Sequence, residues 1–244
     1  MSTPRPNPAR QGAIGICLAA AIVAAWSAVH VYTIFYLDLS GPRLLAAPLP
    51  MALLCWLDVG LFIVAHDAMH GSLVPFRPVL NRTIGRICLF LYAGFSFDRL
   101  IGRHHDHHRH SGTERDPDFH AAGPRAFWPW YATFFLRYFG WREFAVMALW
   151  FFVYVLVLGA SPLNTVLFWA IPSVLASLQL FFFGTYLPHR HDDAGFDTHH
   201  NARSNDYPVL VSLLTCFHFG YHHEHHDDPA TPWWRLPRLR RQGR

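Results

Sequence analysis

The sequence predicts an all-α, integral membrane protein with about four transmembrane helices and several shorter re-entrant or interfacial helices. Of its 244 residues, 52% are hydrophobic and 15% are charged, whereas about a quarter of the residues of an ordinary soluble domain are charged. The apolar residues also form runs that approach the roughly 20 residues a helix needs to cross hydrocarbon. We therefore expect one membrane-embedded domain over residues 1–244.

Four segments are expected to span the membrane. The first follows a polar, Pro/Arg-rich stretch; it is longer than a signal-peptide core and lacks a small-residue cleavage site, so we expect it to be retained. The last two are joined by a very short Ser-Pro connection, which predicts an antiparallel hairpin. The four spans cover about residues 12–37, 50–70, 144–160 and 163–187.

Other segments are expected to lie in or on the membrane without crossing it. Between residues 84 and 101 the uninterrupted apolar run covers only 87–97, which is the length of a re-entrant or interfacial segment. A crossing here would separate the histidines near residue 66 from those near residue 104. Residues 127–139 are rich in aromatic side chains and predict an interfacial helix. The tail is expected to anchor the chain at the interface through Trp233, Trp234, Arg235, Pro237 and Arg238.

The distribution of positive charge predicts the orientation. All 20 basic residues are arginines, and the loops opposite the histidine-rich side carry only Arg43. Because cytoplasmic loops of membrane proteins concentrate positive charge, we expect a multi-pass cell-membrane protein with its termini and histidine clusters on the cytoplasmic side. The pI near 9.0 is explained in the same way, and no nucleic-acid partner is expected, since no arginine stripe interleaves with exposed aromatics in a soluble domain.

The histidines form the most unusual feature of the chain. There are 18, and all except His30 lie between residues 66 and 226. Positions i, i+3 and i+4 share one face of a helix, so clusters at this spacing direct their imidazoles the same way. Three clusters have it: His66 and His70; His104, His107 and His108; His222, His225 and His226. His189 follows the last span at the same membrane side and is a ninth candidate, the alternative being a histidine that interacts with the helix dipole.

The number of histidines predicts two metal ions. Neutral imidazole suits iron, zinc and copper, but a four-ligand zinc site needs far fewer groups. Iron is the first-row metal whose redox chemistry with O₂ can use such a site. The alternative of solvated cytoplasmic histidines is disfavoured, because the clusters interrupt apolar helices at fixed spacing. We therefore expect a di-iron centre with O₂ as co-substrate.

Several neighbouring residues are assigned other roles. His105 and His223 lie about 100° from their neighbours on a helix and are expected to face elsewhere, while His218 is left open as a ligand or a supporting residue. Asp58 lies inside the second span and is either a functional acid or a group near a watery cavity. Eight acids are candidate acceptors for ring N–H groups of ligating histidines: Asp67, Asp106, Glu114, Asp116, Asp118, Glu224, Asp227 and Asp228.

The four cysteines indicate that the chain does not carry its own electron-transfer centre. They are scattered singly, with no CxxC spacing for an iron–sulfur cluster, a zinc site or a redox disulfide. We expect them to be buried hydrophobic side chains. Electrons must then come from a separate donor.

Several stretches of the chain resemble the bacterial-type β-carotene ketolases. They are AHDAMHG at residues 65–71, HHDHHRHSGTERDPDF at 104–119, GTYLPHR at 184–190, CFHFGYHHEHH at 216–226 and PWWRLP at 232–237. The histidine spacings alone are shared by the wider membrane fatty-acid desaturase and hydroxylase superfamily, and the last three stretches narrow the resemblance. It extends over nearly the whole chain from about residue 48.

The resemblance implies oxidation of C4 and C4′ of the β-ionone rings of β-carotene and related carotenoids to ketones, on the route to echinenone, canthaxanthin and astaxanthin. It also implies two irons, O₂, a carotenoid substrate held in the bilayer, and a ferredoxin-like donor with its reductase. A carotenoid ring hydroxylase or an acyl-lipid desaturase of the same superfamily is the nearest alternative. A membrane metal transporter is the non-enzyme alternative, and it predicts ligands at mid-bilayer rather than at span ends.

Overall fold

The computed structural model describes residues 7–193, 195–196 and 198–243, and all regular elements within these residues are helical. Three helical stretches are long and apolar enough to cross a membrane: Pro8–Phe35, Gly41–His70 and Pro162–His189. A fourth is added if the bent pair Phe127–Tyr138 and Trp141–Val157, whose axes meet at 74°, counts as one span. The predicted all-α class with long apolar helices is confirmed.

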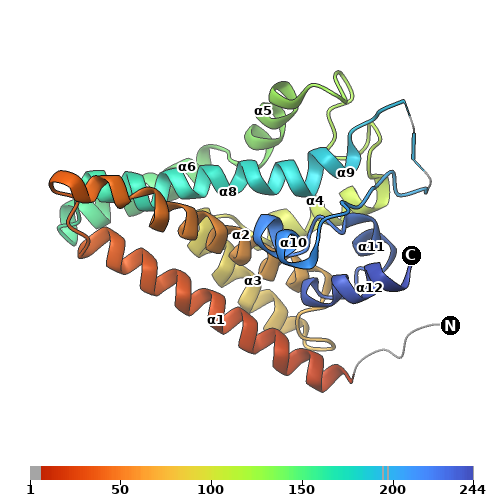
Figure 1. Cartoon of the computed structure of the whole chain (residues 1–244), viewed down its shortest axis with the longest axis horizontal. Helices are drawn as coiled ribbons and strands as arrows, with labels where there is room; N and C mark the ends of the chain where they lie inside the picture. Colours follow the sequence, from red (N-terminus) through yellow and green to blue (C-terminus); the bar gives the residue numbers. More distant parts are fainter. Residues whose placement is uncertain (1–6, 194, 197, 244) are drawn as a thin grey trace.

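Helices α1 (Pro8–Phe35) and α2 (Pro48–His70) pack against each other along the lower part of the view in Figure 1. The side chain of Asn7 accepts a hydrogen bond from the N–H of Ala9 at 2.9 Å, and a proline at the first helical position is compatible with this cap. The 3₁₀ turn η1 (Gly41–Ala46) leads into α2. Helix α1 therefore begins four residues before the predicted span.

Helix α2 is the central helix of the structure, and it contacts α1, α3 (Pro78–Ala93) and α8 (Ile171–Phe181). Most of its second half is buried, including side chains with no exposed surface: Val59, Leu61, Ile63, Val64 and Ala65. Gly71 ends the helix with a φ of 70°, in the left-handed region that glycine adopts without steric cost. The last two turns of α2 carry His66 and His70 to this end.

Helices α3 (Pro78–Ala93) and α4 (Phe97–His110) form a helical pair beside α2. With 16 residues, α3 is about 24 Å long, shorter than the roughly 30 Å hydrocarbon core. Gly94 reverses the chain with a φ of 66°. The chain reverses between the two helices, and the histidines of α4 lie beside those of α2. This geometry fits the predicted non-crossing segment, although the membrane topology itself stays a prediction.

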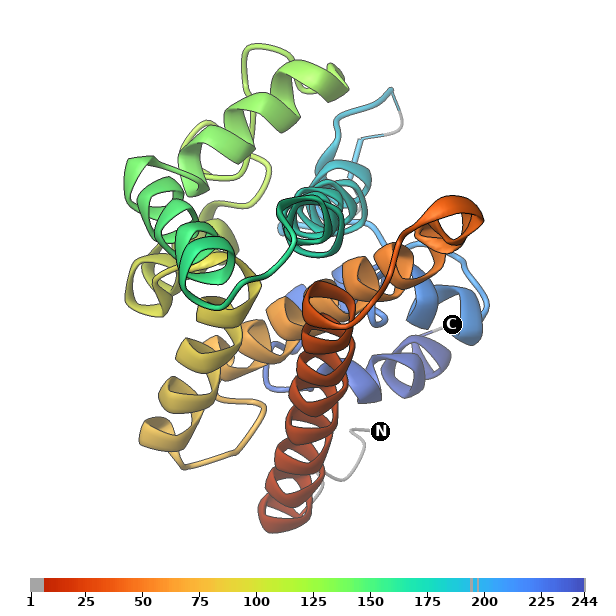
Figure 2. The same cartoon turned by 90° about the vertical axis from the view of Figure 1, so that its left-hand side faces the viewer.

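The aromatic helix α5 (Phe127–Tyr138) lies at the top of Figure 1 and packs against α8 through the buried side chains of Trp130 and Phe181. It is followed by α6 (Trp141–Phe152) and the π-helical turn η2 (Val153–Val157), and these run antiparallel to the next long helix. Figure 2 shows α5 and α6 together, on the side of the structure away from α1. The next long helix has five parts: α7 (Pro162–Thr165), η3 (Val166–Ala170), α8 (Ile171–Phe181), η4 (Phe182–Tyr186) and α9 (Leu187–His189).

Two π-helical turns in this long helix have a cause in the sequence. Pro172 follows η3 and Pro188 follows η4, each two residues after the turn ends. Proline cannot donate a backbone hydrogen bond to the carbonyl four residues earlier, and its ring clashes with that carbonyl. The helix accommodates each proline by widening locally, which keeps it continuous to His189. Such single π-helical turns are frequent near functional sites.

The remaining elements gather at the end of the bundle where α2 and α9 end, on the right of Figure 1. They are α10 (Val209–Cys216), α11 (His222–Asp227), η5 (Trp233–Arg235) and α12 (Leu236–Gln242). Trp233 is 7% exposed, and its backbone N–H donates to the buried Asp67 carboxylate at 3.0 Å. The expectation that Trp233 is an interface anchor is therefore wrong. It packs over the end of α2, where a buried carboxylate requires a donor.

Gly15 provides a test of how α1 supports the end of α2. A Cβ atom at this position would lie 2.2 Å from the backbone carbonyl oxygen of Leu73, just after α2. Gly15→Ala must therefore displace backbone, and we expect a loss of about 1–3 kcal/mol of stability. The measurement is the thermal denaturation midpoint in detergent. Gly102→Ala is the control, because no atom lies within 4 Å of its Cβ position; equal midpoints for both variants would contradict the proposed packing.

Candidate metal centre

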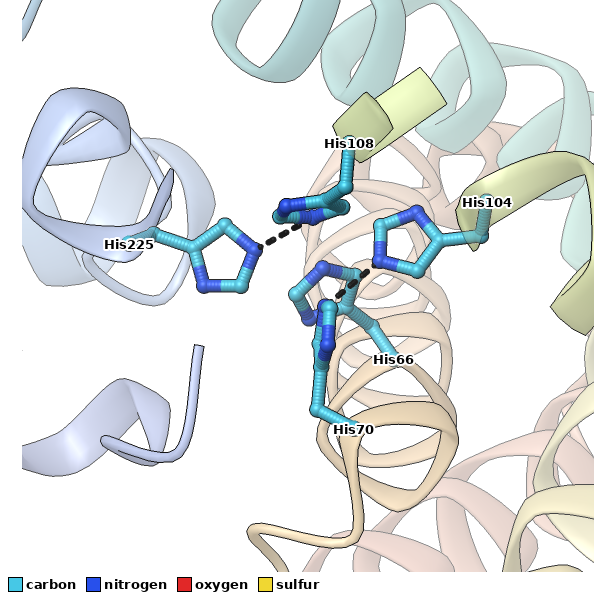
Figure 3. Close-up of side chains that lie close together, drawn as sticks. All are labelled: His66, His70, His104, His108 and His225. Carbon is cyan, nitrogen blue, oxygen red and sulfur yellow. Dashed lines mark hydrogen bonds between the residues drawn. The ribbon is translucent and has the colours of Figure 1, made fainter. Parts of the chain in front are cut away.

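Five histidines from three helices converge in the group shown in Figure 3, which we call cluster A. Each offers one ring nitrogen, and these nitrogens all lie within 4.8 Å of one another. The Nε2 atoms of His70 and His104 are 2.6 Å apart, and those of His108 and His225 are 3.1 Å apart. The members of cluster A are His66 and His70 from α2, His104 and His108 from α4, and His225 from α11.

A second group of four histidines, cluster B, lies directly beside the first. Its ring nitrogens also lie within 4.8 Å of one another, and all four residues are buried. The Nε2 atom of His222 is 2.9 Å from that of His189 and 3.1 Å from that of His226. The two clusters touch where the rings of His108 and His226 stack with centroids 4.2 Å apart. The members of cluster B are His107 from α4, His189 from α9, and His222 and His226 from α11.

The arrangement of these nitrogens fits metal ions. A metal–nitrogen bond of about 2.1 Å places neighbouring ligand nitrogens about 3 Å apart, close to the spacing observed here. Within the described residues, both ring nitrogens of His66 are buried and without a hydrogen-bond partner, a situation that costs free energy unless another ligand is bound. Burial lowers the pKa of His108, His225 and His226, so these rings are neutral and able to coordinate.

Cluster B is held in place by hydrogen bonds from the outer nitrogens of its rings. The Nδ1 of His107 donates to the two Asp116 oxygens at 2.9 and 3.0 Å, and the Nδ1 of His189 donates to the Asn201 carbonyl at 2.7 Å. Burial alone would lower the pKa of His107, but the Asp116 carboxylate raises it above its usual value. Such outer contacts fix the tautomer and direct Nε2 toward a metal.

Asp116 is itself held by the loop that follows α4. Its carboxylate accepts hydrogen bonds from the backbone N–H groups of Gly112 and Asp118, both at 2.8 Å. Asp118 belongs to the same loop, and its carboxylate accepts a hydrogen bond from the Tyr138 hydroxyl. Burial raises the pKa of Asp118 to about 6. The loop thus connects the His107 ring to helix α5.

Of the eight acids that the sequence suggested, Asp116 is the one with a hydrogen bond to a clustered histidine in the described part of the chain. Asp67 lies 3.7 Å from the Nδ1 of His66, which is an ion-pair distance rather than a hydrogen bond. Asp106 pairs with Arg109 on the exposed face of α4, and Asp227 pairs with His223. The Asn201 carbonyl was not predicted, because every residue carries a backbone carbonyl and no sequence pattern distinguishes this one.

The structure also locates the histidines that the sequence left outside the site. His105 and His223 belong to neither cluster, as their helical positions predicted. His218, for which the sequence allows either a ligand or a supporting role, lies outside both clusters, with its Nδ1 3.2 Å from the Ser212 hydroxyl. Asp58 accepts a hydrogen bond from the indole N–H of Trp26 at 2.7 Å. This buried pair joins α1 to α2 and gives Asp58 a structural role.

Comparisons with known proteins agree with this geometry. The family model described as fatty acid desaturase matches residues 41–145 and 137–244. A beta-carotene ketolase of Paracoccus sp. (strain PC1) is 51% identical over 246 residues, covering 100% of this chain and 99% of the relative. The chain belongs to the β-carotene ketolase family. This family membership confirms the resemblance read from the sequence, and it places the chain within the wider fatty acid desaturase family.

Further ketolases show the same relationship. A beta-carotene ketolase of Paracoccus sp. (strain N81106 / MBIC 01143) is 51% identical over 232 residues, which cover 95% of this chain and 94% of the relative. A beta-carotene ketolase of Haematococcus lacustris is 36% identical over 262 residues, with 96% and 81% covered. No solved structure gives a significant match to the chain.

An apolar pocket of this ketolase-family chain reaches both clusters. Phe219 lies on its wall and contacts His66 and His222 edge-on, with ring centroids 4.6 and 4.8 Å apart. Phe219 is thus in contact with both clusters at once. The pocket is lined by residues of α2, α3, α4, α5, α8, η4 and α11 and of the connections between helices: Phe62, His66, Met69, Tyr92, Phe95, Leu100, His104, His107, Asp118, Phe134, Phe135, Tyr138, Phe139, Ser177, Leu180, Gly184, Thr185, Phe219 and His222.

Removing the acceptor of His107 tests the role of the outer contacts. We expect Asp116→Ala to lower metal affinity by about 10–100-fold, since the loss of such a partner frees the ligand to rotate. The measurement is metal per polypeptide after dialysis against a graded chelator. Asp106→Ala is the matched control on the exposed face of α4, and metal retention equal to this control would argue against the role of Asp116.

A double-mutant cycle tests the position of Phe219. A Cβ atom on Gly184 would lie 2.6 Å from its ring, and the ring cannot retreat because the clustered histidines are behind it. Gly184→Ala should therefore lower the thermal denaturation midpoint, and adding Phe219→Leu should restore part of it. We expect a coupling of about 0.5–3 kcal/mol, as found for residues in contact. Additive effects of the two substitutions on stability would show that the Phe219 ring does not contact Gly184.

Proposed function

We propose that the chain is an O₂-dependent di-iron oxygenase that oxidises C4 and C4′ of the β-ionone rings of β-carotene and related carotenoids to ketones. The products are echinenone and canthaxanthin, and the reaction lies on the route to astaxanthin. The observation that carries this proposal is an apolar pocket that reaches two adjacent all-histidine clusters, in a chain 51% identical to a named beta-carotene ketolase. Iron is proposed as the metal because the reaction requires activation of O₂.

The reaction is two successive hydroxylations of one allylic carbon. Each consumes one O₂, two electrons and two protons, replaces one C–H bond by C–O–H, and releases one water. The second produces a carbon with two hydroxyl groups, which loses water and becomes the ketone. When bound, the two irons supply the activation of O₂ and the transfer of one oxygen atom to carbon.

The nine clustered histidines are the proposed ligands, with cluster A and cluster B holding one ion each. Asp116 and the Asn201 carbonyl orient His107 and His189. Because these hydrogen bonds hold the proton on Nδ1, the Nε2 atom of each ring is unprotonated and faces the cluster. The pocket supports the substrate assignment, because its aromatic and aliphatic walls favour a hydrocarbon ring and exclude water.

A separate protein is proposed as the electron donor, a ferredoxin with its reductase. All four cysteines are free; Cys55, Cys88 and Cys216 are buried as expected, whereas Cys17 is exposed on the outer face of α1, so that expectation was wrong for Cys17. Isolated cysteines at these positions give no iron–sulfur ligand set. The donor would approach from the cytoplasm if the arginine distribution sets the orientation of a multi-pass protein in the cell membrane.

The position of the clusters argues against a metal transporter. The histidines lie at the ends of α2 and of the long helix that closes with α9, and α4 and α11 reach the same end of the bundle. A transport path needs binding groups near the middle of several spans. The gathering of all nine at one end, beside an apolar pocket, favours an enzyme acting on a lipophilic substrate.

Expression in cells that produce β-carotene tests the proposed function. We expect echinenone and canthaxanthin in the extracted pigments, and their loss below detection in His107→Ala. His105→Ala, a neighbouring histidine outside both clusters, should keep the product. Zeaxanthin without ketones would identify a ring hydroxylase, and altered acyl chains would identify a desaturase. Iron assays of the purified protein should give two ions per polypeptide, and ketone formation without bound iron would contradict the proposed centre.

A further inference from the structure

The side chain of Thr185 differs from the other helical threonines. In the described part of the chain, five of them donate their hydroxyl hydrogen to the carbonyl one turn earlier: Thr33, Thr83, Thr133, Thr165 and Thr215. Thr185 is only 6% exposed, yet its hydroxyl has no hydrogen-bond partner among the described residues. Its oxygen is not one of the fully buried side-chain atoms that lack a partner, so it is accessible from the pocket that Thr185 lines. The hydroxyl can therefore both donate to and accept from a molecule bound there.

The backbone around Thr185 accounts for this exception. Thr185 lies in the π-helical turn η4, where the N–H of Leu187 bonds to the carbonyl of Phe182, five residues earlier. This spacing departs from the α-helical geometry in which a threonine hydroxyl reaches the carbonyl four residues back. The turn itself follows from Pro188. The sequence therefore places a polar group in a helix while removing its usual local partner.

The Thr185 side chain lines the apolar pocket, one helical turn before the cluster B residue His189. Three other lining residues carry hydroxyl groups, and all three are already engaged. Tyr92 donates to the Ser173 carbonyl at 3.1 Å, Tyr138 donates to Asp118, and Ser177 donates to the Val174 carbonyl at 2.7 Å. Within the described residues, Thr185 is thus the lining hydroxyl with its full capacity available.

We propose that the Thr185 hydroxyl binds the oxygen that the first oxidation places on the substrate ring, and so holds the alcohol in the pocket for the second oxidation. This inference rests on the proposed function. A hydrocarbon ring has no group to pair with Thr185, whereas the C4 alcohol can donate to it and accept from it. The pairing favours retention of the alcohol over its release into the membrane, and the second hydroxylation then proceeds to the ketone.

The size of the effect follows from the strength of one neutral hydrogen bond. Such a bond changes an equilibrium by about fivefold, enough to shift the partition of the alcohol between further oxidation and release. Thr185→Val keeps the shape of the side chain and removes the hydroxyl. We expect the ratio of 4-hydroxylated to 4-keto pigment in β-carotene-producing cells to rise about fivefold, because less of the alcohol is retained.

Two further variants separate hydrogen bonding from packing. Thr185→Ser keeps a hydroxyl and should return the ratio of alcohol to ketone to the wild-type value. Thr165→Val is the matched control, a buried threonine of the same long helix whose hydroxyl already donates to the Ser161 carbonyl at 2.9 Å; it should leave the ratio unchanged. Because the readout is a ratio of two products, it does not depend on how much of each variant is produced.

Binding to the purified, iron-loaded protein in the absence of an electron donor gives a second measurement independent of turnover. We expect the wild type to bind a 4-hydroxylated carotenoid about fivefold more tightly than β-carotene, seen as a shift of the polyene absorption band, and Thr185→Val to lose this preference. Ketone formation by the wild type with an unchanged product ratio and binding preference in Thr185→Val would overturn the role of Thr185 alone. A wild type that forms no ketone would instead overturn the proposed function.

Discussion

The convergence of nine imidazole rings at one end of a helical bundle is the constraint on which the rest of the structure depends. Each ring directs a single nitrogen into its cluster, and in a neutral ring that nitrogen is either a donor or an acceptor, so the converging nitrogens at about 3 Å from one another cannot all be satisfied by hydrogen bonds among themselves. Metal ions bound between the rings would resolve this conflict. The fold must therefore bring four helical segments together at a single place, and hold them there against the cost of burying polar rings.

Helix α2 provides most of the support that holds these segments together. It is buried along its second half, supported by α1, and flanked by the α3–α4 pair that returns toward its end. The two clusters then differ in their surroundings. Cluster B is fully buried and has outer contacts through Asp116 and the Asn201 carbonyl, whereas His70, His104 and His108 of cluster A are only half-buried. The same protein thus offers a closed and a more accessible position, joined by the stacked rings of His108 and His226.

Helical periodicity was sufficient to predict much of the fold and of the candidate site. Residues spaced i, i+3 and i+4 share a face whatever the rest of the chain does, so the sets in α2, α4 and α11 could be read directly. The parity argument for residues 84–101 likewise agrees with the short α3 and its return through α4. His189 could be proposed because it closes an apolar helix at the same end.

What the sequence did not reveal depends on contacts between segments distant along the chain. The pairing of His107 with Asp116 requires the loop after α4 to fold back, and the packing of Trp233 over Asp67 joins residues 166 positions apart. The free hydroxyl of Thr185 required knowledge of the π-helical turn η4, since a threonine in a regular helix would bond locally. Burial and loop geometry, rather than residue type, decide these contacts.

The contribution of α11 to both clusters has a consequence for biosynthesis. His225 completes cluster A, and His222 and His226 complete cluster B, yet α11 is translated after all the long apolar helices. While those helices are being made, the nascent chain carries only part of each histidine cluster. A metal ion that needs every histidine of either cluster would therefore bind only after α11 has been made, whereas α2 and α4 alone already present four of the five histidines of cluster A.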